Sequence, residues 1–359
     1  MKISTAIIGA GVSGLYAASL LNKSGQAVTV FETRQRIGGR ILSEPVSSAR
    51  GTHLFDLGPT WYWPESEHTI SRLVDEYGLT AFSQPTAGAM VLERQAGRVE
   101  HHVLPKESIV PSNRLEGGMT TLVEALARQL PPGTILLGTK VTAIRQAEDR
   151  VAVTYTDEQG TLTELYDRVV LALPPRLVDH IAFEPALSGT LRAKLNETPT
   201  WMAGQAKAIA VYETPFWREE GQSGFGISWV GPLQEIHDAS PTEGPGALFG
   251  FLRLSPEERQ RVGEAGVKAR VLEQLVQLYG TQANHPIAFL YYDWSADIAT
   301  ATAEDALPLT DFPVFRPIEG DDSWQDRIAF AGTETNGEFG GHIEGALRSA
   351  ERIVSRWMD

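Results

Sequence analysis

The feature that most constrains this chain is a glycine-rich turn between an apolar strand and a helix near its N-terminus. Residues 5–8 read Thr-Ala-Ile-Ile, and Gly9, Gly11 and Gly14 follow with the spacing G-x-G-x-x-G. In a βαβ unit, the first glycine permits a tight turn and the second lets the backbone approach a pyrophosphate. The third allows close packing of the helix on the strand, and the positive end of the helix dipole would face the phosphates.

An acidic residue completes this pattern. The apolar run at 27–31 predicts a second strand, and Glu32 follows it directly. A carboxylate at this place can accept hydrogen bonds from both hydroxyls of an adenosine ribose, whereas a 2′-phosphate would call for an arginine, so NADP is disfavoured. A glycine turn of no special function is the alternative for the hexapeptide alone, but the strand, helix and acid together predict a dinucleotide site.

A second glycine pair follows within the basic segment 34–40, Arg-Gln-Arg-Ile-Gly-Gly-Arg. Gly39 again allows close backbone approach, and Arg34 and Arg40 carry forked donors that suit phosphate oxygens. A basic surface turn is the alternative reading. Near the other end, the run 327–331 predicts a strand that leads into Gly-Thr-Glu at 332–334, and a further glycine pair opens a helix to Trp357.

Composition excludes several classes of protein. The 359 residues suggest about two domains, and the hydrophobic content of 42% is that of an ordinary globular chain. A net charge of −14 disfavours nucleic acid and anionic membranes as partners. No apolar run reaches 18 residues, so no membrane span is expected. Without cysteine there is no disulfide or thiolate chemistry, which is compatible with a cytoplasmic location, and no metal site is predicted.

The segment 34–40 behind Glu32 and the ending at 327–357 resemble those of the flavin-containing amine oxidase superfamily, and matching segments occur in the same order over nearly the whole chain. That superfamily includes monoamine, polyamine and L-amino-acid oxidases and, more distantly, phytoene desaturases. The resemblance implies an α/β fold: a Rossmann-like FAD-binding domain with a discontinuous second domain built on a mixed or antiparallel sheet plus helices. The predicted division is 1–78, 113–183 and 298–359 for FAD, and 79–112 and 184–297 for substrate.

The resemblance also assigns the cofactor contacts. The turn at 58–60 would pass the flavin, a strand residue near 141 would touch the adenine, and the C-terminal glycine-rich helix start would face the flavin pyrimidine. The FAD-binding residues expected in this way are Gly9, Gly11, Val12, Ser13, Gly14, Glu32, Arg34, Gly39, Arg40, Gly58, Pro59, Thr60, Val141, Ala172, Gly332, Glu334, Gly341, His342, Ile343 and Ala346.

Lys207 is the principal catalytic candidate because it interrupts an apolar strand, 206–212. A lysine at a sheet edge whose ammonium reaches water is the alternative. The run 207–217 resembles the lysine strand of the family, in which the lysine holds a water at flavin N5. His342 and Trp294 complete the expected catalytic set.

The resemblance implies a small-molecule amine or amino acid and O2 as partners. Hydride would pass from the carbon next to nitrogen to flavin N5, the imine would hydrolyse, and oxygen would reoxidise the flavin to give peroxide, so that the cofactor carries the difficult chemistry. Two alternatives are a flavin enzyme that acts on C–C bonds or on a carrier-linked intermediate, and a non-catalytic FAD-binding protein.

The chain departs from the family pattern at the substrate side. Family members with covalent flavin use a cysteine about nine residues after the tryptophan matched by Trp294, where Ala303 stands here, so we expect non-covalent FAD. The two aromatic-cage positions hold Glu304 and His342, which would bind a polar or cationic group or serve the structure. The expected substrate-binding residues are Trp61, Tyr62, Trp63, Trp294, Glu304 and His342.

The long helical insertion of the family is missing between Gly78 and Gly117, where only residues 79–116 remain. A reduced lid would leave the flavin face wetter. Two alternatives follow: a second subunit of a homo-oligomer covers the opening, or a large substrate supplies its own cover. We prefer an open cleft for a bulky or polar amine.

Overall fold

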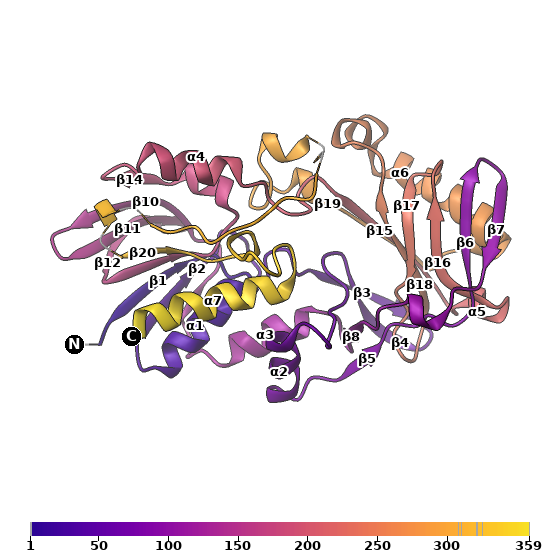
Figure 1. The fold of residues 1–359 in the computed structure, drawn as a ribbon, viewed down its shortest axis with the longest axis horizontal. Coiled ribbons are helices and arrows are strands. Elements are labelled where there is room, and N and C mark those ends of the chain that lie inside the picture. Colours follow the sequence, from indigo (N-terminus) through magenta and orange to yellow (C-terminus); the bar gives the residue numbers. More distant parts are fainter. Residues whose placement is uncertain (1, 308, 310, 321, 325, 359) are drawn as a thin grey trace.

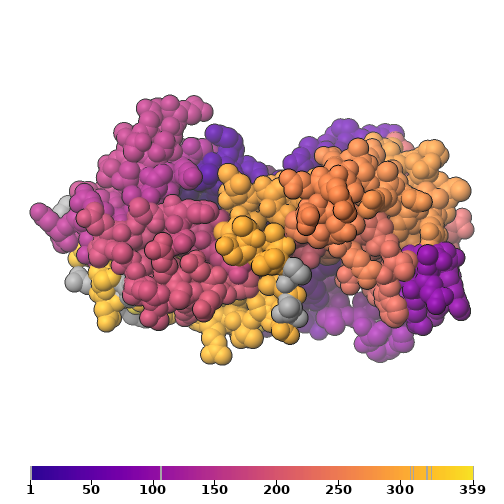
Figure 2. All heavy atoms as spheres, turned by 90° about the horizontal axis from the view of Figure 1, so that it is seen from above, coloured from indigo at the N-terminus to yellow at the C-terminus, as the bar shows by residue number. Residues whose placement is uncertain are grey.

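The computed structural model describes residues 2–307, 309, 311–320, 322–324 and 326–358. Two lobes lie side by side: one is built around β1, β2, α1 and α7, and the other around β15 to β18 with α6 (Figure 1). The view turned by 90° shows the same two masses with a waist between them (Figure 2). The chain passes between the lobes several times, so residues of both meet at the waist.

The first lobe contains a parallel sheet of five strands in the order β20-β13-β1-β2-β9. Its strands are β1 (Ser4–Ile8), β2 (Ala27–Phe31), β9 (Ile135–Leu136), β13 (Arg168–Leu171) and β20 (Ile328–Phe330). Four helices pack with it: α1 (Val12–Lys23), α2 (His68–Glu76), α3 (Thr120–Arg128) and α7 (Ile343–Met358). This is the predicted Rossmann-like arrangement.

The glycines of the N-terminal turn are required by close packing. Gly9 has φ of 110°, and a Cβ there would lie 2.4 Å from the carbonyl oxygen of Ala172. A Cβ on Gly14 would lie 2.0 Å from the oxygen of Gly9. Leu15 and Leu21 are fully buried on the inner face of α1. The tight turn predicted at Gly9 and the close helix packing predicted at Gly14 are therefore both present, and neither position has room for a side chain.

A four-stranded sheet, β12-β11-β10-β14, lies beside the parallel sheet. It contains β10 (Lys140–Ala147), β11 (Arg150–Asp157), β12 (Gly160–Tyr166) and β14 (Ala182–Glu184). The 3-10 helix η2 (Pro175–His180) and helix α4 (Gly189–Glu197) adjoin it, and Leu191 and Leu195 pack into the same buried cluster as Val169.

The second lobe is a seven-stranded sheet in the order β19-β15-β18-β17-β16-β6-β7. Its strands are β6 (Ala89–Gln95), β7 (Arg98–His102), β15 (Ala206–Tyr212), β16 (Gln222–Ser228), β17 (Leu233–Asp238), β18 (Gly246–Leu252) and β19 (Ala288–Asp293). Every neighbouring pair is antiparallel except β16 with β6, so the sheet is mixed, as predicted. The inner face of α6 (Pro256–Tyr279) buries Val267, Val271 and Leu275 in this lobe's core.

Short elements join the lobes. Two small sheets pair β3 (Ser43–Ser48) with β4 (Gly51–Asp56) and β5 (Ala81–Ser83) with β8 (Asn113–Leu115). The remaining helices are short: α5 (Phe216–Glu219), η1 (Lys106–Ser108), η3 (Thr281–Asn284), η4 (Trp294–Ala296), η5 (Ala303–Ala306), η6 (Asp322–Trp324) and η7 (Thr333–Thr335).

The segment 79–116 contains no α-helix; it supplies β5 to β8 and η1. All strands of the five-stranded sheet fall within the ranges predicted for FAD, and all strands of the seven-stranded sheet within those predicted for substrate. The division stays a prediction, and α4, numbered within the substrate range, packs with the first lobe. Among the described residues, no helix has the length and apolar character needed to cross a membrane.

Candidate active site

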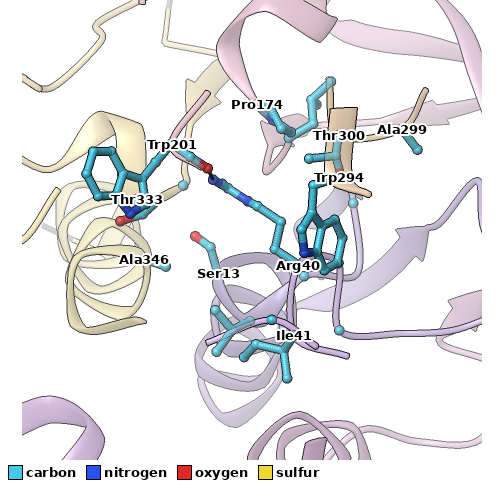
Figure 3. A pocket seen from close by; sticks show the side chains of 18 of the residues that line it. Ser13, Arg40, Ile41, Pro174, Trp201, Trp294, Ala299, Thr300, Thr333 and Ala346 are labelled. Atoms are coloured by element: carbon cyan, nitrogen blue, oxygen red, sulfur yellow. Dashed lines mark hydrogen bonds between the residues drawn. The ribbon is translucent and has the colours of Figure 1, made fainter. Parts of the chain in front are cut away.

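A cavity of about 470 Å³ lies at the waist, where the carboxyl ends of β1, β13 and β20 face β15 and η4. Ligands of open α/β sheets bind at this end of the strands. The lining comes from residues 8–13, 31–41, 57–67, 139–141, 172–181, 201–207, 251, 294–300 and 332–346, although not every residue of each range contributes. Segments predicted from both ends of the chain thus meet around one space (Figure 3).

Glu32 lines the cavity at the end of β2 and is 4% exposed. Its Oε2 accepts a hydrogen bond from the N–H of Ala10 at 2.9 Å, and its Oε1 accepts one from the N–H of Arg34 at 2.9 Å. Because each carboxylate oxygen has two acceptor sites, both oxygens can still accept a hydroxyl. The turn and the basic segment therefore hold the carboxylate in place, with acceptor sites left on both oxygens.

Arg34 does not present its guanidinium freely to the cavity. Its Nη2 donates to both carboxylate oxygens of Asp297, each at 2.9 Å, and to Oγ1 of Thr300 at 2.7 Å. Thr300 lines the cavity with its neighbour Ala299 (Figure 3). Arg34 thus joins the nucleotide side of the cavity to the segment that follows η4.

Arg40 reaches across the cavity toward Trp201 (Figure 3). Its Nη1 and Nη2 donate to the two oxygens of Glu334 at 2.6 and 3.0 Å, and Nη1 also donates to the carbonyl of Trp201 at 2.9 Å. The N–H of Trp201 donates to Glu334 at 3.0 Å. Because a guanidinium has five N–H donors, two of those of Arg40 are not used in these three bonds.

Lys207 lies in the middle of the sheet, since β15 pairs with both β18 and β19, so the sheet-edge alternative is excluded. Its side chain is 1% exposed, and Nζ donates to the carbonyl of Gly58 at 2.9 Å and to Oγ1 of Thr60 at 2.5 Å. Burial lowers the pKa of Lys207 to about 7, although the charge of Asp56 opposes this shift. A lysine that titrates near neutral pH therefore faces the cavity.

The aromatic wall is formed by Trp61, Trp63 and Trp294. The indole N–H of Trp294 donates to the carbonyl of Leu57 at 3.1 Å, which fixes the ring. His342, at the start of α7, lies 5.2 Å from Trp63 between ring centroids, and its Nδ1 lies 2.6 Å from Oε1 of Glu67.

Most of the remaining predicted cofactor residues also line this cavity: Gly9, Gly11, Val12, Ser13, Gly39, Gly58, Pro59, Thr60, Val141, Ala172, Gly332, Gly341, Ile343 and Ala346. Gly14 is not among the lining residues, because it packs against Gly9 instead.

The structure does not bring Tyr62, Ala303 or Glu304 to the cavity. Tyr62 is 3% exposed within the first lobe's core, where its backbone pairs with Asn113. Ala303 and Glu304 are exposed on η5. The reason is a capping box in which Thr302 and Asp305 bond each other, while Arg176 holds Asp305, so that Glu304 is turned outward. Thr300 and Ala299 occupy the cavity edge instead.

Sequence reasoning missed Glu67 and Trp201. Glu67 is 2% exposed and lies next to α2, a position where an acidic residue is usually only a solvated part of the first turn. Trp201 faces Gly341, where a Cβ would lie 3.0 Å from the indole. No spacing pattern joins either residue to its partner, which lies more than a hundred residues away in the chain.

The model of the family described as flavin containing amine oxidoreductase matches residues 86–356, and an NAD(P)-binding Rossmann-like model matches residues 7–77. The chain belongs to the flavin-containing amine oxidoreductase family. It is therefore a flavin-dependent amine oxidoreductase, as the resemblance implied.

The similar proteins have low sequence identity to this chain, but the alignments cover most of both chains. A putrescine oxidase of Kocuria rosea is 26% identical, with 81% of this chain and 82% of the relative covered. A putative flavin-containing monoamine oxidase of Mycobacterium tuberculosis is 25% identical, with 98% and 96% covered. That alignment spans 459 positions against the 359 residues of this chain, so at least 100 positions of the relative have no counterpart here.

Solved structures show the same fold. A redesigned putrescine oxidase superposes with a TM-score of 0.83 at 22% identity and 99% coverage of both chains. Cyclohexylamine oxidase from Brevibacterium oxydans superposes with a TM-score of 0.80 at 21% identity, with both chains fully covered.

The residues of the cavity fit a flavin nucleotide. A Cβ on Gly58 would lie 2.0 Å from the carbonyl of Arg40, and one on Gly39, which has φ of 59°, would lie 3.3 Å from Cα of Gly11. Glycine at these two places lets backbone segments pack closely beside the cavity, whereas a Cβ on Gly11, which lines the cavity, would meet no protein atom within 4 Å. Glu32 adds acceptors and Arg40 adds donors to the same lining.

The low pKa of Lys207 predicts a dependence of stability on pH. An unfolded lysine keeps its proton to about pH 10.4. Because the folded form loses its proton near pH 7, stability should rise from pH 7 to pH 10 relative to a Lys207→Met variant. Calorimetric melting of both proteins from pH 6 to 10 measures this difference, and a constant difference would contradict the buried, titrating lysine.

Proposed function

We propose that the protein is an FAD-dependent amine oxidase with a non-covalently bound cofactor. When bound, the flavin would accept two electrons from the C–H bond next to the amine nitrogen and pass them to O2, which leaves as peroxide, while water hydrolyses the imine. The observation that carries this proposal is Lys207, a buried lysine at the wall of the cavity that the nucleotide-binding turn enters.

The identity of the nucleotide as FAD rests on Glu32 and on the family resemblance. The carboxylate of Glu32 suits an unmodified ribose, and Val141, which the resemblance assigns to the adenine, also lines the cavity. Non-covalent attachment is supported by the composition, because the chain contains no cysteine. Ala303, at the position of the linking cysteine, is exposed and away from the cavity.

The residues of this chain would divide the remaining work. Lys207, fixed by Gly58 and Thr60, would orient a water or donate a proton at the oxygen-reactive side of the ring. Its charge, when present, would stabilise negative charge that develops during the reaction with oxygen. Trp294 and Trp61 would exclude water from the face that receives the substrate.

An amine suits this cavity better than an amino acid does. Its lining contains two arginines, Arg34 and Arg40, and both are held by carboxylates, of Asp297 and Glu334. A third arginine that could clamp an α-carboxylate is lacking among the described residues of the lining. Ile298, which is 83% exposed, marks an apolar rim open to solvent and supports an open cleft that admits a bulky amine.

Denaturation should release the cofactor intact. Acid precipitation of the purified yellow protein is expected to leave FAD in the supernatant, because no thiol is present to bind it. Absorbance and chromatography of the supernatant identify the nucleotide. Flavin that stays with the pellet would show another covalent link, and FMN in the supernatant would overturn the assignment to FAD.

An amine should reduce the flavin directly. Anaerobic mixing with members of an amine panel, including putrescine, cyclohexylamine and benzylamine, is expected to bleach the flavin absorbance near 450 nm in at least one case, about as fast as turnover. Admission of oxygen should restore the colour with release of peroxide. Amino acids serve as the comparison series. A flavin that dithionite bleaches but no amine does would contradict the proposed function.

A further inference from the structure

Glu67 and His342 form a carboxylate–imidazole pair in the wall of the cavity. Oε1 of Glu67 lies 2.6 Å from Nδ1 of His342, and both residues line the cavity. The carboxylate is 2% exposed, whereas the imidazole is 37% exposed. The buried member thus supports the member that reaches the open space.

The position of Glu67 is fixed from two sides. Its Oε2 accepts the N–H of Trp63 at 2.8 Å. The first turn of α2, which follows it, is held by the buried carboxylate of Glu344, which accepts the N–H groups of Thr69 and Ile70 at 3.1 and 2.9 Å. His342 directly precedes α7 and Glu344 lies in its first turn, while Glu67 directly precedes α2, so the contacts between the starts of these two helices hold the pair in place.

The hydrogen bond to Glu67 decides the tautomer of the imidazole. A carboxylate only accepts hydrogen bonds, so Nδ1 of His342 must carry a proton. In the neutral ring, Nε2 is then an acceptor, and no hydrogen bond to it is found among the described residues. The cavity wall therefore offers one acceptor nitrogen whose orientation the carboxylate maintains.

The other acidic residues that line the cavity each form an ion pair with an arginine. Glu334 binds Arg40, and Glu32 lies 3.6 Å from Arg34. Glu67 has no such partner within salt-bridge distance in the described part of the chain, and only the imidazole faces it. With a neutral imidazole, the pair carries one uncompensated negative charge, which favours a cation beside it.

Aromatic rings extend this wall. Trp63 lies 5.2 Å from the ring of His342, and Trp61 meets Trp63 edge to face at 6.4 Å. Both indoles line the cavity. Indole faces attract cations and cover the carbon chain that carries them.

We infer that Glu67, His342 and Trp63 form the subsite that selects a substrate ammonium group: His342 accepts the N–H through Nε2, Trp63 packs on the adjoining carbons, and Glu67 is the positioning residue. This inference rests on the proposed function and adds how the amine is recognised: it binds as its cation, and its proton passes to Nε2 of His342 before the C–H bond breaks, because an imine forms only from a nitrogen that carries a lone pair. Neutral molecules of the same shape lack the attraction between the ammonium charge and the Glu67 carboxylate, so they should bind more weakly.

The test uses a cation that cannot react. Cumylamine carries no hydrogen on the carbon next to nitrogen, so it binds the holoenzyme without turnover, and cumyl alcohol is its neutral analogue. Titration calorimetry gives both dissociation constants for the wild type and for Glu67→Gln, His342→Phe and the double variant. Glu65→Gln, an exposed acid two residues from Glu67, is the matched control.

The wild type should prefer the cation, and each single variant should bind cumylamine about tenfold more weakly, as expected for one charge-assisted hydrogen bond. Binding of cumyl alcohol should change less than about twofold, a split that a general loss of structure would not produce. The double variant should be no weaker than the weaker single variant, because the two residues act as one pair.

Equal preference of the wild type for alcohol and cation would overturn the inference, and so would a Glu67→Gln or His342→Phe protein with wild-type affinity for cumylamine. If Glu67→Gln fails to fold, His342→Phe alone decides, since its side chain is partly exposed. Failure of the proposed function is a separate outcome, in which no oxidisable amine bleaches the wild-type flavin whatever cumylamine does.

Discussion

The ion pair between Arg40 and Glu334 is the interaction on which the rest of the site depends. It joins the basic segment 34–40 to η7, the 3-10 helix that follows β20, and both partners also bond the backbone of Trp201. Glu334 is 1% exposed, so removal of Arg40 would leave a buried carboxylate without its ion-pair partner, which costs several kcal/mol. Three segments that are far apart in the chain are thereby held around one cavity.

A second group of buried charges lies behind the cavity. Lys207, Asp56 and Arg114 influence one another, and burial is the largest cause that raises the pKa of Asp56 and lowers the pKa of Arg114. Asp56 accepts the N–H of Met119 at 2.8 Å, and Arg114 donates to the carbonyls of Ala239 and Ser240 at 2.7 Å. A fold would gain stability from apolar residues here. A buried lysine whose surroundings lower its pKa, at the wall of a cavity, is typical of a functional site.

The sequence predicted what local chemistry determines and missed what long-range packing determines. The glycine turn, Glu32 and the lysine strand follow from spacing along 30 residues or fewer, and the structure places all of them at the cavity. Glu304 was expected to bind substrate, but the turn at Thr302 and Asp305 points its side chain to solvent. A contact between Asp305 and Arg176 fixes that turn. Glu67 was overlooked because the contact that suggests a function for it is with His342, 275 residues away in the chain. Family membership confirms a flavin-dependent amine oxidoreductase. At the two aromatic-cage positions, however, this chain has Glu304 and His342, so the family pattern does not predict the substrate-binding wall.

The most direct test of this account is hydrogen–deuterium exchange of the apoprotein and of the same protein reconstituted with FAD. One cofactor bound along the whole cavity should slow exchange together in 9–14, 38–40 and 332–346, since these ranges surround it. Strand β7, at the far edge of the second lobe, should exchange at the same rate in both states. Protection confined to the N-terminal turn, with none at 332–346, would show that the two ends of the chain do not share one flavin, and would contradict the account.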